Sequence, residues 1–199
     1  YQSYLRVLTP EQRRQLYAPQ VAAQVDLDYV EQLGWRHFAA LEEGDLLDRA
    51  LYQDLMMYLP DDILALSDRI GMLHSLELRV PFIDHKVVEY CARIPADLKI
   101  KGMAKKHLLK KVARRYLPDD VIDHRKQGFS SPMAMWLRSE LRPTVDQWLS
   151  GERLQRQGIF APATVAGLID DHYARRRLSH KTIFSLLMFS KWAEGRLDG

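Results

Sequence analysis

Residues 45–74 read DLLDRALYQDLMMYLPDDILALSDRIGMLH and predict two helices in succession. The first half of this stretch has helical period, because one face collects the apolar side chains of Leu47, Leu51, Leu55 and Tyr58. Pro60 is expected to end this helix, since proline has no backbone N–H. A second helix is then expected to begin with Asp61 and Asp62 in its first turn, where carboxylates are favourable.

Helical period also dominates the rest of the chain, and no alternating strand pattern or Asn-Gly hairpin signal interrupts it. Residues 9–25 open with Thr9 as the N-cap, Pro10 at the first helical position and Gln12 where a capping box requires it. Further helices are expected within residues 85–94, 104–118, 130–149, 161–176 and 179–195.

Two proline-containing segments refine this prediction. Residues 76–84 should be the most extended part of the chain, because Pro81 biases Val80 away from helix. The helix within residues 130–149 is expected to use Ser131 as its cap and Pro132 as its first residue, and to bend or break at Arg142-Pro143. The prediction is a single all-α unit over residues 1–199.

Composition limits the classes of protein that the chain can represent. Apolar residues make up 47% of 199 residues, which is enough for a packed core, and the formal net charge of +3 does not demand nucleic acid. The single cysteine, Cys91, cannot form an internal disulfide, so a reducing compartment, the cytoplasm, is expected. No segment is long enough to span a membrane. Because the first residue is Tyr1 rather than methionine, the chain is expected to be a piece of a longer protein.

Several chemistry-bearing residues are expected to be structural. No Walker loop, Rossmann glycine pattern or zinc spacing is present, and no metal site is predicted. His124, His172 and His180 are expected at the surface or at caps, and Cys91 in the core. Core packing is the preferred interpretation of the tryptophans Trp136, Trp148 and Trp192.

Two groups of basic residues have two interpretations each. Six cations, Lys105, Lys106, Lys110, Lys111, Arg114 and Arg115, cover the helix around the apolar residues Leu108, Leu109, Val112 and Tyr116. A solvated face is the preferred interpretation from composition, and phosphate contact is the alternative. Arg125 and Lys126 precede Gly128, which lets the backbone present a lysine without steric cost. From composition a solvated loop is the preferred interpretation, and a lysine that reaches an anion is the alternative.

Carboxylates gather upstream of these cations. Asp61, Asp62, Asp68, Glu77 and Asp84 lie in one stretch with Arg69 and Arg79. A structural ion-pair network that fixes the turn around Pro81 and a role in substrate binding are about equally supported.

The ordered motifs in this region resemble the C-terminal synthetase domain of the glutamine-dependent asparagine synthetase family. The family pattern Leu-Pro-Asp-Asp, Asp-Arg, Met, Ser-x-Glu-x-Arg-x-Pro-Phe-x-Asp corresponds to Leu59–Asp62, Asp68-Arg69, Met72 and Ser75–Asp84. Downstream, Lys106 and Lys126 fall on two family lysines that are also twenty positions apart. These motifs cover residues 58–137, and residues 9–17 also look like the family's lead-in.

The resemblance implies an activity, cofactors and residue roles. Family members use ATP, with Mg²⁺, to adenylate the side-chain carboxylate of aspartate, and ammonia from a glutaminase domain then displaces AMP. Lys126 would close over the phosphates, and Lys106, held on the preceding helix, would be the fixed partner cation. Asp61 or Asp62, with Asp62 preferred, would lie next to the substrate. Glu77 and Arg79 would hold the turn, with Asp84 pairing nearby and Asp68 and Arg69 organising the site.

Three departures from the family pattern qualify what the resemblance implies. The Ser-Gly-Gly-x-Asp-Ser phosphate loop and the N-terminal catalytic cysteine are absent from the 199 residues, and Leu66 stands where relatives often have a basic residue. The chain is therefore expected to be the helical C-terminal part of a larger α/β adenine-nucleotide α-hydrolase-like (PP-loop) domain, whose sheet and phosphate loop lie upstream. On its own it should be inactive.

The motifs leave other functional interpretations open. They do not separate asparagine formation from β-lactam-forming, peptide-modifying or polysaccharide-modifying relatives. Nucleic acid and a membrane are not expected partners, and a homodimer remains open. The main alternative is a helical nucleic-acid-binding or scaffolding module that uses the basic helix of residues 104–116. A degenerate homologue that serves as an interaction partner is the third interpretation.

Overall fold

The computed structural model describes residues 7–124 and 131–196. These residues form helices joined by turns and irregular segments, with no β-strand among them, so the all-α prediction is confirmed for the described chain. The only extended pairings there are isolated bridges, Tyr17 with Phe160 and Lys101 with Ala104. The chain divides into two compact units, one from Tyr1–Val30 with Gln127–Gly199 and one from Glu31–Lys126. The assignment of residues 1–199 to a single domain stays a prediction.

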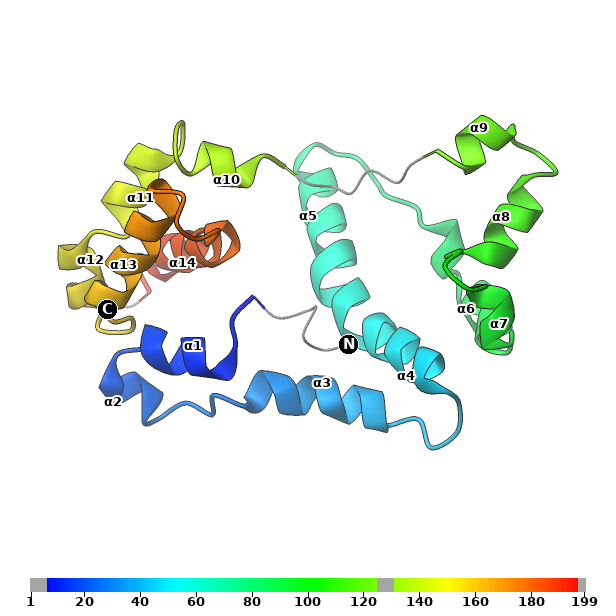
Figure 1. Ribbon diagram of the computed structural model, residues 1–199, viewed down its shortest axis with the longest axis horizontal. Coiled ribbons are helices and arrows are strands. Elements are labelled where there is room, and N and C mark those ends of the chain that lie inside the picture. The colour runs from blue at the N-terminus through cyan, green and yellow to red at the C-terminus, as the bar shows by residue number, and fades with distance from the viewer. Residues whose placement is uncertain (1–6, 125–130, 197–199) are drawn as a thin grey trace. The chain divides into compact units, whose positions relative to one another are not determined.

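The first of these, unit 1, combines the beginning and the end of the chain (Figure 1). Its helices are α1 (Pro10–Leu16), α2 (Pro19–Ala22), α10 (Met133–Trp136), α11 (Arg142–Trp148), α12 (Gly151–Gln157), α13 (Pro162–Tyr173) and α14 (His180–Ala193). The predicted capping box is confirmed, because the Thr9 hydroxyl accepts a hydrogen bond from Gln12 N and the Gln12 side chain accepts one from Thr9 N.

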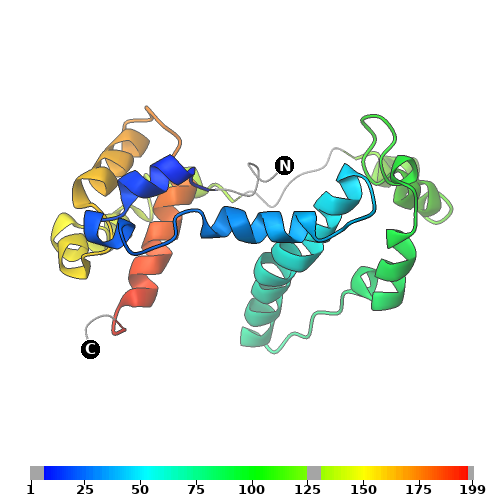
Figure 2. The ribbon, with the colours of Figure 1, turned by 90° about the horizontal axis from the view of Figure 1, so that it is seen from below.

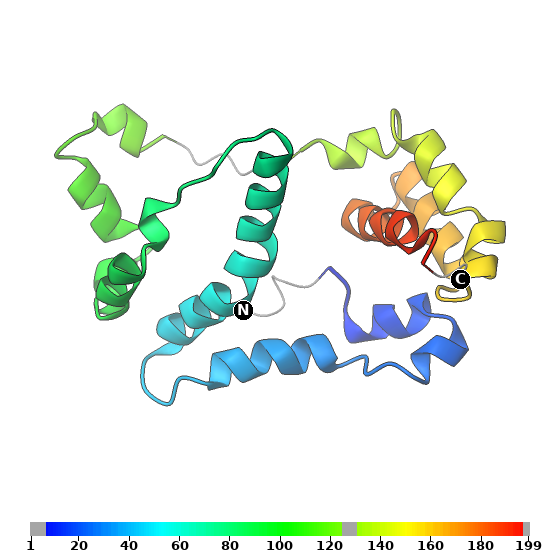
Figure 3. The ribbon, with the colours of Figure 1, turned by 180° about the vertical axis from the view of Figure 1, so that it is seen from behind.

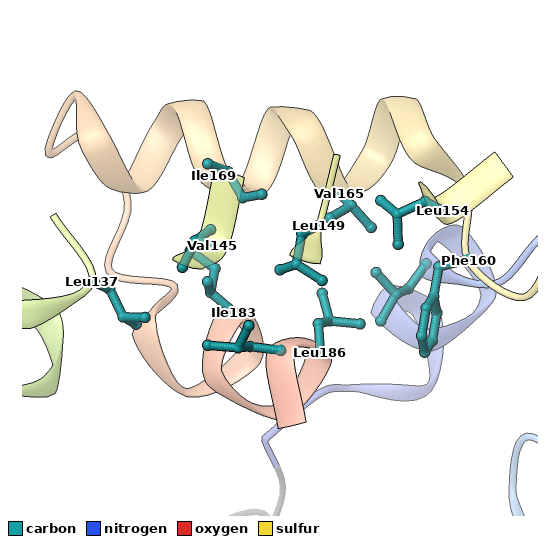
Figure 4. Close-up of a cluster of buried hydrophobic side chains, with 11 residues drawn as sticks. Leu137, Val145, Leu149, Leu154, Phe160, Val165, Ile169, Ile183 and Leu186 are labelled. Carbon is teal, nitrogen blue, oxygen red and sulfur yellow. The ribbon is translucent and has the colours of Figure 1, made fainter. Parts of the chain in front are cut away.

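Unit 1 has a hydrophobic core of its own (Figure 4). Side chains from α11, α12, α13 and α14 converge on it, and Leu137, Val145, Val165 and Ile183 are completely buried. Ser190 carries polar links at this core: its hydroxyl donates to the Trp148 carbonyl at 2.9 Å and accepts from Gln157 Nε2 at 3.0 Å. The α1 helix covers part of the cluster through Leu16.

Residues 9–25 form two short helices in place of one continuous helix. Tyr17 ends α1 in an extended conformation, since Pro19 starts the next helix two residues later. The extended residues pair with the segment before α13: Ala18 N donates to Ile159 O and Ala161 N donates to Leu16 O, each at 2.8 Å. This pairing joins the N-terminal part of unit 1 to the segment between α12 and α13.

The second unit, unit 2, is a succession of helices in which one bent helical run follows the first helix (Figure 3). After α3 (Tyr29–Ala39), which begins in unit 1, come α4 (Leu46–Gln53), the π-helix η2 (Asp54–Leu64), α5 (Ala65–Leu73), the 3₁₀ turn η3 (Pro81–Ile83), α6 (His85–Ala92), α7 (Ala96–Lys99), α8 (His107–Ala113) and α9 (Asp119–Ile122). Figure 2 shows the irregular segment that joins α5 to the following helices.

The prediction that Pro60 ends a helix is wrong. The α4, η2 and α5 helices follow one another without a break from Leu46 to Leu73, and Pro60 lies inside the π-helical part. In an α-helix the proline ring would clash with the carbonyl four residues earlier. The wider π turn bonds to the carbonyl five residues back and relieves that clash.

Other expectations about single residues also need correction. Cys91 is exposed, not in the core, and His172 is completely buried on α13, not at the surface. Trp192 is 55% exposed, so core packing is wrong for that tryptophan. The cap of α10 is Pro132 and not Ser131, because Pro132 has non-helical dihedral angles.

The remaining boundary predictions hold. A new helix, α11, begins at Arg142, which confirms the break expected at Arg142-Pro143. The helix α6 ends before Pro95, and α13 and α14 occupy the two predicted closing segments.

In the described residues, no helix has the length and apolar character needed to cross a bilayer.

Candidate functional site

The expected substrate-side carboxylates lie on the continuous helical run of unit 2. Asp61 and Asp62 belong to η2, three and two residues before its end, and Asp68 and Arg69 belong to α5. Asp61 and Asp62 are therefore in the interior of a helical run, not in a first turn as expected. All four side chains are exposed, and none forms an ion pair or hydrogen bond with any described residue. Their charges are thus available to a ligand.

A close turn follows this run and sets the position of the next motif. Gly71 lies so close to the returning chain that an added Cβ would meet Leu76 O at 2.9 Å and Leu78 Cδ1 at 2.7 Å. Leu76 N donates to Gly71 O at 2.9 Å, and Ser75 takes a left-handed conformation with φ 57° to complete the reversal. The glycine is required here because any side chain would push residues 76–78 away from α5.

Of the three charged residues around Pro81, Glu77 and Arg79 form an ion pair and Asp84 caps helix α6. Arg79 donates from Nε to Glu77 Oε1 at 3.1 Å and from Nη2 to Oε2 at 3.4 Å. Asp84 does not join this pair; its Oδ1 accepts from Lys86 N at 2.9 Å and caps α6. Both members of the ion pair are mostly exposed, so solvent screening leaves it little stabilising energy. The expected network is therefore wrong in the part assigned to Asp84.

Lys106 is not held on a helix, contrary to expectation. It precedes the first residue of α8 and has φ 57° and ψ 36°, a left-handed conformation that is uncommon for lysine. The turn before it is closed by Lys101 and Ala104, which exchange two backbone hydrogen bonds of 3.1 and 2.9 Å. Such strain is a common property of functional positions. The Lys106 side chain is exposed and makes no described ion pair.

The basic run of residues 105–115 is partly neutralised. Asp123 accepts from Arg114 at 2.6 Å and from Lys110 at 3.3 Å, and Asp119 accepts from Arg114 at 3.0 Å. These hydrogen bonds raise the pKa of Arg114 and lower the pKa of Asp123. Two of the six cations are thus committed to carboxylates on or beside α9, which weakens the case for a phosphate-binding stripe along α8.

One ion pair in unit 2 was not anticipated from the sequence. Lys99 Nζ donates to Asp48 Oδ1 at 2.8 Å and to Ala92 O at 3.3 Å, which links α4 to α6 and α7. The Lys99 and Asp48 side chains are only 16% and 30% exposed, and the hydrogen bond from Lys99 lowers the pKa of Asp48. No sequence signal could have found the pair, because its partners are 51 residues apart.

The structure gathers only part of the predicted site. Asp61, Asp62, Asp68 and Arg69 share one helical run, and Glu77 and Arg79 follow its closing turn. Among the described residues, no hydrogen bond or ion pair joins Lys106 to any of them. Lys126, with Arg125 and Gly128, lies outside the described residues. Within residues 7–124 and 131–196, no three metal-ligating side chains come together.

Most of the chain is similar to known asparagine synthetases. The family model described as asparagine synthase matches residues 2–194. An asparagine synthetase (glutamine-hydrolyzing) 1 of Bacillus subtilis is 32% identical over 148 residues, which are 73% of this chain and 23% of that protein. A putative asparagine synthetase (glutamine-hydrolyzing) of Mycobacterium bovis is 31% identical over 165 residues, or 82% of this chain and 24% of that protein.

A relative with a different name also matches. A protein named amidase chry2, of Gibberella zeae, is 28% identical over 116 residues, which are 55% of this chain and 17% of that protein. No solved structure gives a significant match. The chain spans about a quarter of the length of the two synthetases that it matches.

Proposed function

The chain belongs to the asparagine synthase family, and from this premise we propose that it is part of an ATP-dependent amidotransferase that converts aspartate into asparagine. The observation that carries the proposal is the family match over residues 2–194, because it includes every motif on which the site is built. The names of the two synthetase relatives, which hydrolyse glutamine, support ammonia from glutamine as the nitrogen source.

The proposed reaction has two steps. A side-chain carboxylate oxygen of aspartate attacks the α-phosphorus of ATP, and pyrophosphate leaves. The nitrogen of ammonia then attacks the activated carbonyl carbon, AMP leaves with the oxygen, and the new amide loses a proton. Negative charge develops on the phosphates in the first step, so cations held near them lower its barrier.

Lys106 and Lys126 are the cations proposed for that task. Lys106 is suited to it because its side chain is exposed and, among the described residues, has no carboxylate partner. A lysine is a compact point charge with three donors and can follow a phosphate group that changes position during reaction. The left-handed backbone of Lys106 sets the direction in which its side chain leaves the chain.

Asp61 and Asp62 are proposed to face the substrate, with Asp62 the preferred residue. Exposed carboxylates without a protein partner can accept hydrogen bonds from the α-amino group of aspartate or from ammonia. They also fit Mg²⁺, which usually takes one or two carboxylates together with phosphate oxygens and water. When bound, Mg²⁺ would supply neutralisation of the phosphate charge; the chain's own contribution is the pair of carboxylates.

The test is pyrophosphate release by the complete polypeptide that contains this chain, with ATP, aspartate and ammonia supplied. We expect Lys126→Ala and Lys106→Ala each to lower the rate by roughly 100-fold or more, as loss of one transition-state donor does. Lys111→Ala is the matched control, because Lys111 is an exposed lysine on α8 without a described partner. Near-normal release by both active-site variants would remove these lysines from the mechanism.

Two further comparisons sharpen the same assay. Asp62→Asn should raise the KM for aspartate more than Asp61→Asn does; the reverse order would transfer the role to Asp61. Release of pyrophosphate with another carboxylate, but not with aspartate, would retain adenylation and refute asparagine as the product. The 199-residue chain alone should release none, because the family's phosphate-loop motif is not in its sequence.

A further inference from the structure

A small cavity of about 120 Å³ lies within unit 1, beside the start of α14. Three parts of the unit form its wall: the region of α1, residues 164–168 of α13, and residues 177–182, which lead into α14 and include its first turn. The lining includes Leu8, Leu16, Leu168, Arg177, Ser179 and Thr182. None of them belongs to the site proposed above, which lies in unit 2.

The start of α14 is electropositive and lacks a cap. The Ser179 side chain makes no capping hydrogen bond, and no acidic residue lies in the first turn. His180 and Lys181 occupy the first two positions instead, where cations oppose the positive end of the helix dipole. The first-turn N–H groups of a helix have no intrahelical acceptor. The start of this 14-residue helix can therefore donate hydrogen bonds to an anion.

Polar side chains at the cavity also lack partners. Ser179 is only 5% exposed, and its Oγ has no hydrogen-bond partner. Thr182 is 8% exposed, and its hydroxyl makes no hydrogen bond to a described residue. A buried hydroxyl without a partner is unfavourable by about 1–3 kcal/mol in protein interiors. A ligand oxygen would satisfy both hydroxyls.

Arg177 supplies a charge at the same wall. Its neighbour Arg176 donates to Asp171 at 2.8 Å, whereas the Arg177 guanidinium has no partner among the described residues. The other part of the wall is apolar, with Leu8, Leu16 and Leu168. The wall therefore combines donors and one cation on one side with aliphatic carbon on the other.

We propose that this cavity binds a small carboxylate with a short apolar chain. The carboxylate accepts from the α14 N-terminus, from the Ser179 and Thr182 hydroxyls and from Arg177, and the chain contacts the leucines. The size agrees with about six non-hydrogen atoms, because a cavity of about 150 Å³ is known to hold benzene. The site does not depend on the amidotransferase chemistry and is independent of the proposed function.

The test is a titration of the isotope-labelled 199-residue chain with butyrate, followed by amide NMR. Saturable shifts are expected at residues 179–182 and at Thr164 and Leu168. Butanol, which has the chain without the charge, should not saturate, and inorganic phosphate should bind at least about tenfold more weakly. Absence of saturable shifts would overturn the site, and tighter binding of phosphate would overturn the carboxylate assignment.

Two variants test the residues, with a matched control. Arg177→Gln is expected to weaken butyrate binding about tenfold and Thr182→Val about fivefold, since each removes donors to the carboxylate. Arg156→Gln removes one exposed cation from α12, which does not line the cavity, and should change the affinity less than twofold. Equal losses in Arg177→Gln and Arg156→Gln would show a general charge effect and overturn the proposal. The dispersion of each amide spectrum confirms that the variants fold.

Discussion

The two units of the chain place their apolar side chains in opposite ways. Every residue of the buried cluster lies in unit 1, where helices α11 to α14 enclose it. In unit 2 the side chain of Gln53 is the only large one that is fully buried among the described residues, whereas Leu73, Phe82 and Met103 are 81%, 72% and 96% exposed. Although 47% of its residues are apolar, the chain has its buried cluster in only one of its two units, among the described residues.

The exposed residues of unit 2 are not scattered. On η2 and α5, Ile63, Leu66, Ile70 and Leu73 follow helical spacing and are 39%, 55%, 50% and 81% exposed. Asp61 and Asp68 lie on the opposite side of the same run by the same spacing. An amphipathic helix is stabilised mainly by burial of its apolar face. The stability of unit 2 is therefore expected to depend on a cover, meaning other protein surface packed against the apolar face of η2 and α5. The stability of unit 1 is not expected to need one.

The largest predicted effect compares one residue type in the two units. Ile183 on α14 is completely buried, and Ile70 on α5 is 50% exposed. Ile183→Ala should lower the free energy of unfolding by about 2–5 kcal/mol, because it leaves a cavity in the core. Ile70→Ala should change it by less than about 0.5 kcal/mol. Urea denaturation of the 199-residue chain, followed by tryptophan fluorescence, measures both.

The same pair can also sharpen the comparison. In the complete polypeptide, a cover over α5 would make Ile70→Ala as costly as a core substitution. Equal and large effects in the isolated chain would contradict the contrast between the two units.

The second prediction compares two helical glycines. Gly71→Ala should destabilise unit 2 by about 1–3 kcal/mol, because the added Cβ would meet the Leu76 carbonyl at 2.9 Å and force the turn open. Gly167→Ala is the matched control, since no atom lies within 4 Å of its added Cβ. It should stabilise α13 by up to about 1 kcal/mol.

Hydrogen exchange separates these outcomes. Faster exchange of the Leu76 amide, which donates to Gly71 O, is expected only in the Gly71 variant. Unchanged exchange there would show that the turn tolerates a side chain.

The all-α class and several helix boundaries of unit 1 could be predicted from the sequence, because these depend on local signals, whereas the break after Leu16 and the cap of α10 could not. Thr9 and Gln12 form the capping box, and α11 begins at Arg142, as their patterns indicate. The same kind of local signal gave a wrong prediction at Pro60, which lies inside a helix and does not end one. Its usual effect assumes α-helical bonding, and the π-helical run that accommodates it has no local signature.

The candidate site was less predictable than the fold. The residues themselves could be selected by their motifs, but their contacts depend on the chain's path. Asp84 could cap α6 or pair with Arg79, and only the turn geometry decides for the cap. The left-handed backbone of Lys106 and the pairing of Asp48 with Lys99 likewise follow from tertiary structure.

A third prediction separates stability from function at Lys106. Lys106→Gly removes the strain of a left-handed lysine and should stabilise unit 2 by about 1 kcal/mol. In the complete polypeptide the same variant should lose pyrophosphate release as Lys106→Ala does. Denaturation midpoints and the release assay measure the two effects. A variant that is more stable and fully active would show that the strain serves no chemical role.

The last prediction concerns pH and is confined to unit 1. His172 is completely buried on α13, and its Nε2 lies 3.2 Å from Ala134 O and 3.4 Å from Arg138 Nε. Burial, followed by the positive charges of Arg138 and His180, lowers the pKa of His172 from its ordinary value of 6.5. The folded chain thus binds fewer protons at this residue than the unfolded chain does just below that pH.

The sign of the effect follows from this difference. The free energy of unfolding must rise with pH between the folded pKa of His172 and 6.5, so the stabilisation is present above 6.5 and is lost as the pH falls. His172→Gln should remove this component of the pH dependence, whereas His124→Gln, at an exposed position in unit 2, should retain it. Denaturation at a series of pH values measures the slopes. Because the core and His172 both lie in unit 1, lower pH should reduce the free energy of unfolding of unit 1. Identical slopes in the two variants would contradict the assignment of this pH dependence to His172.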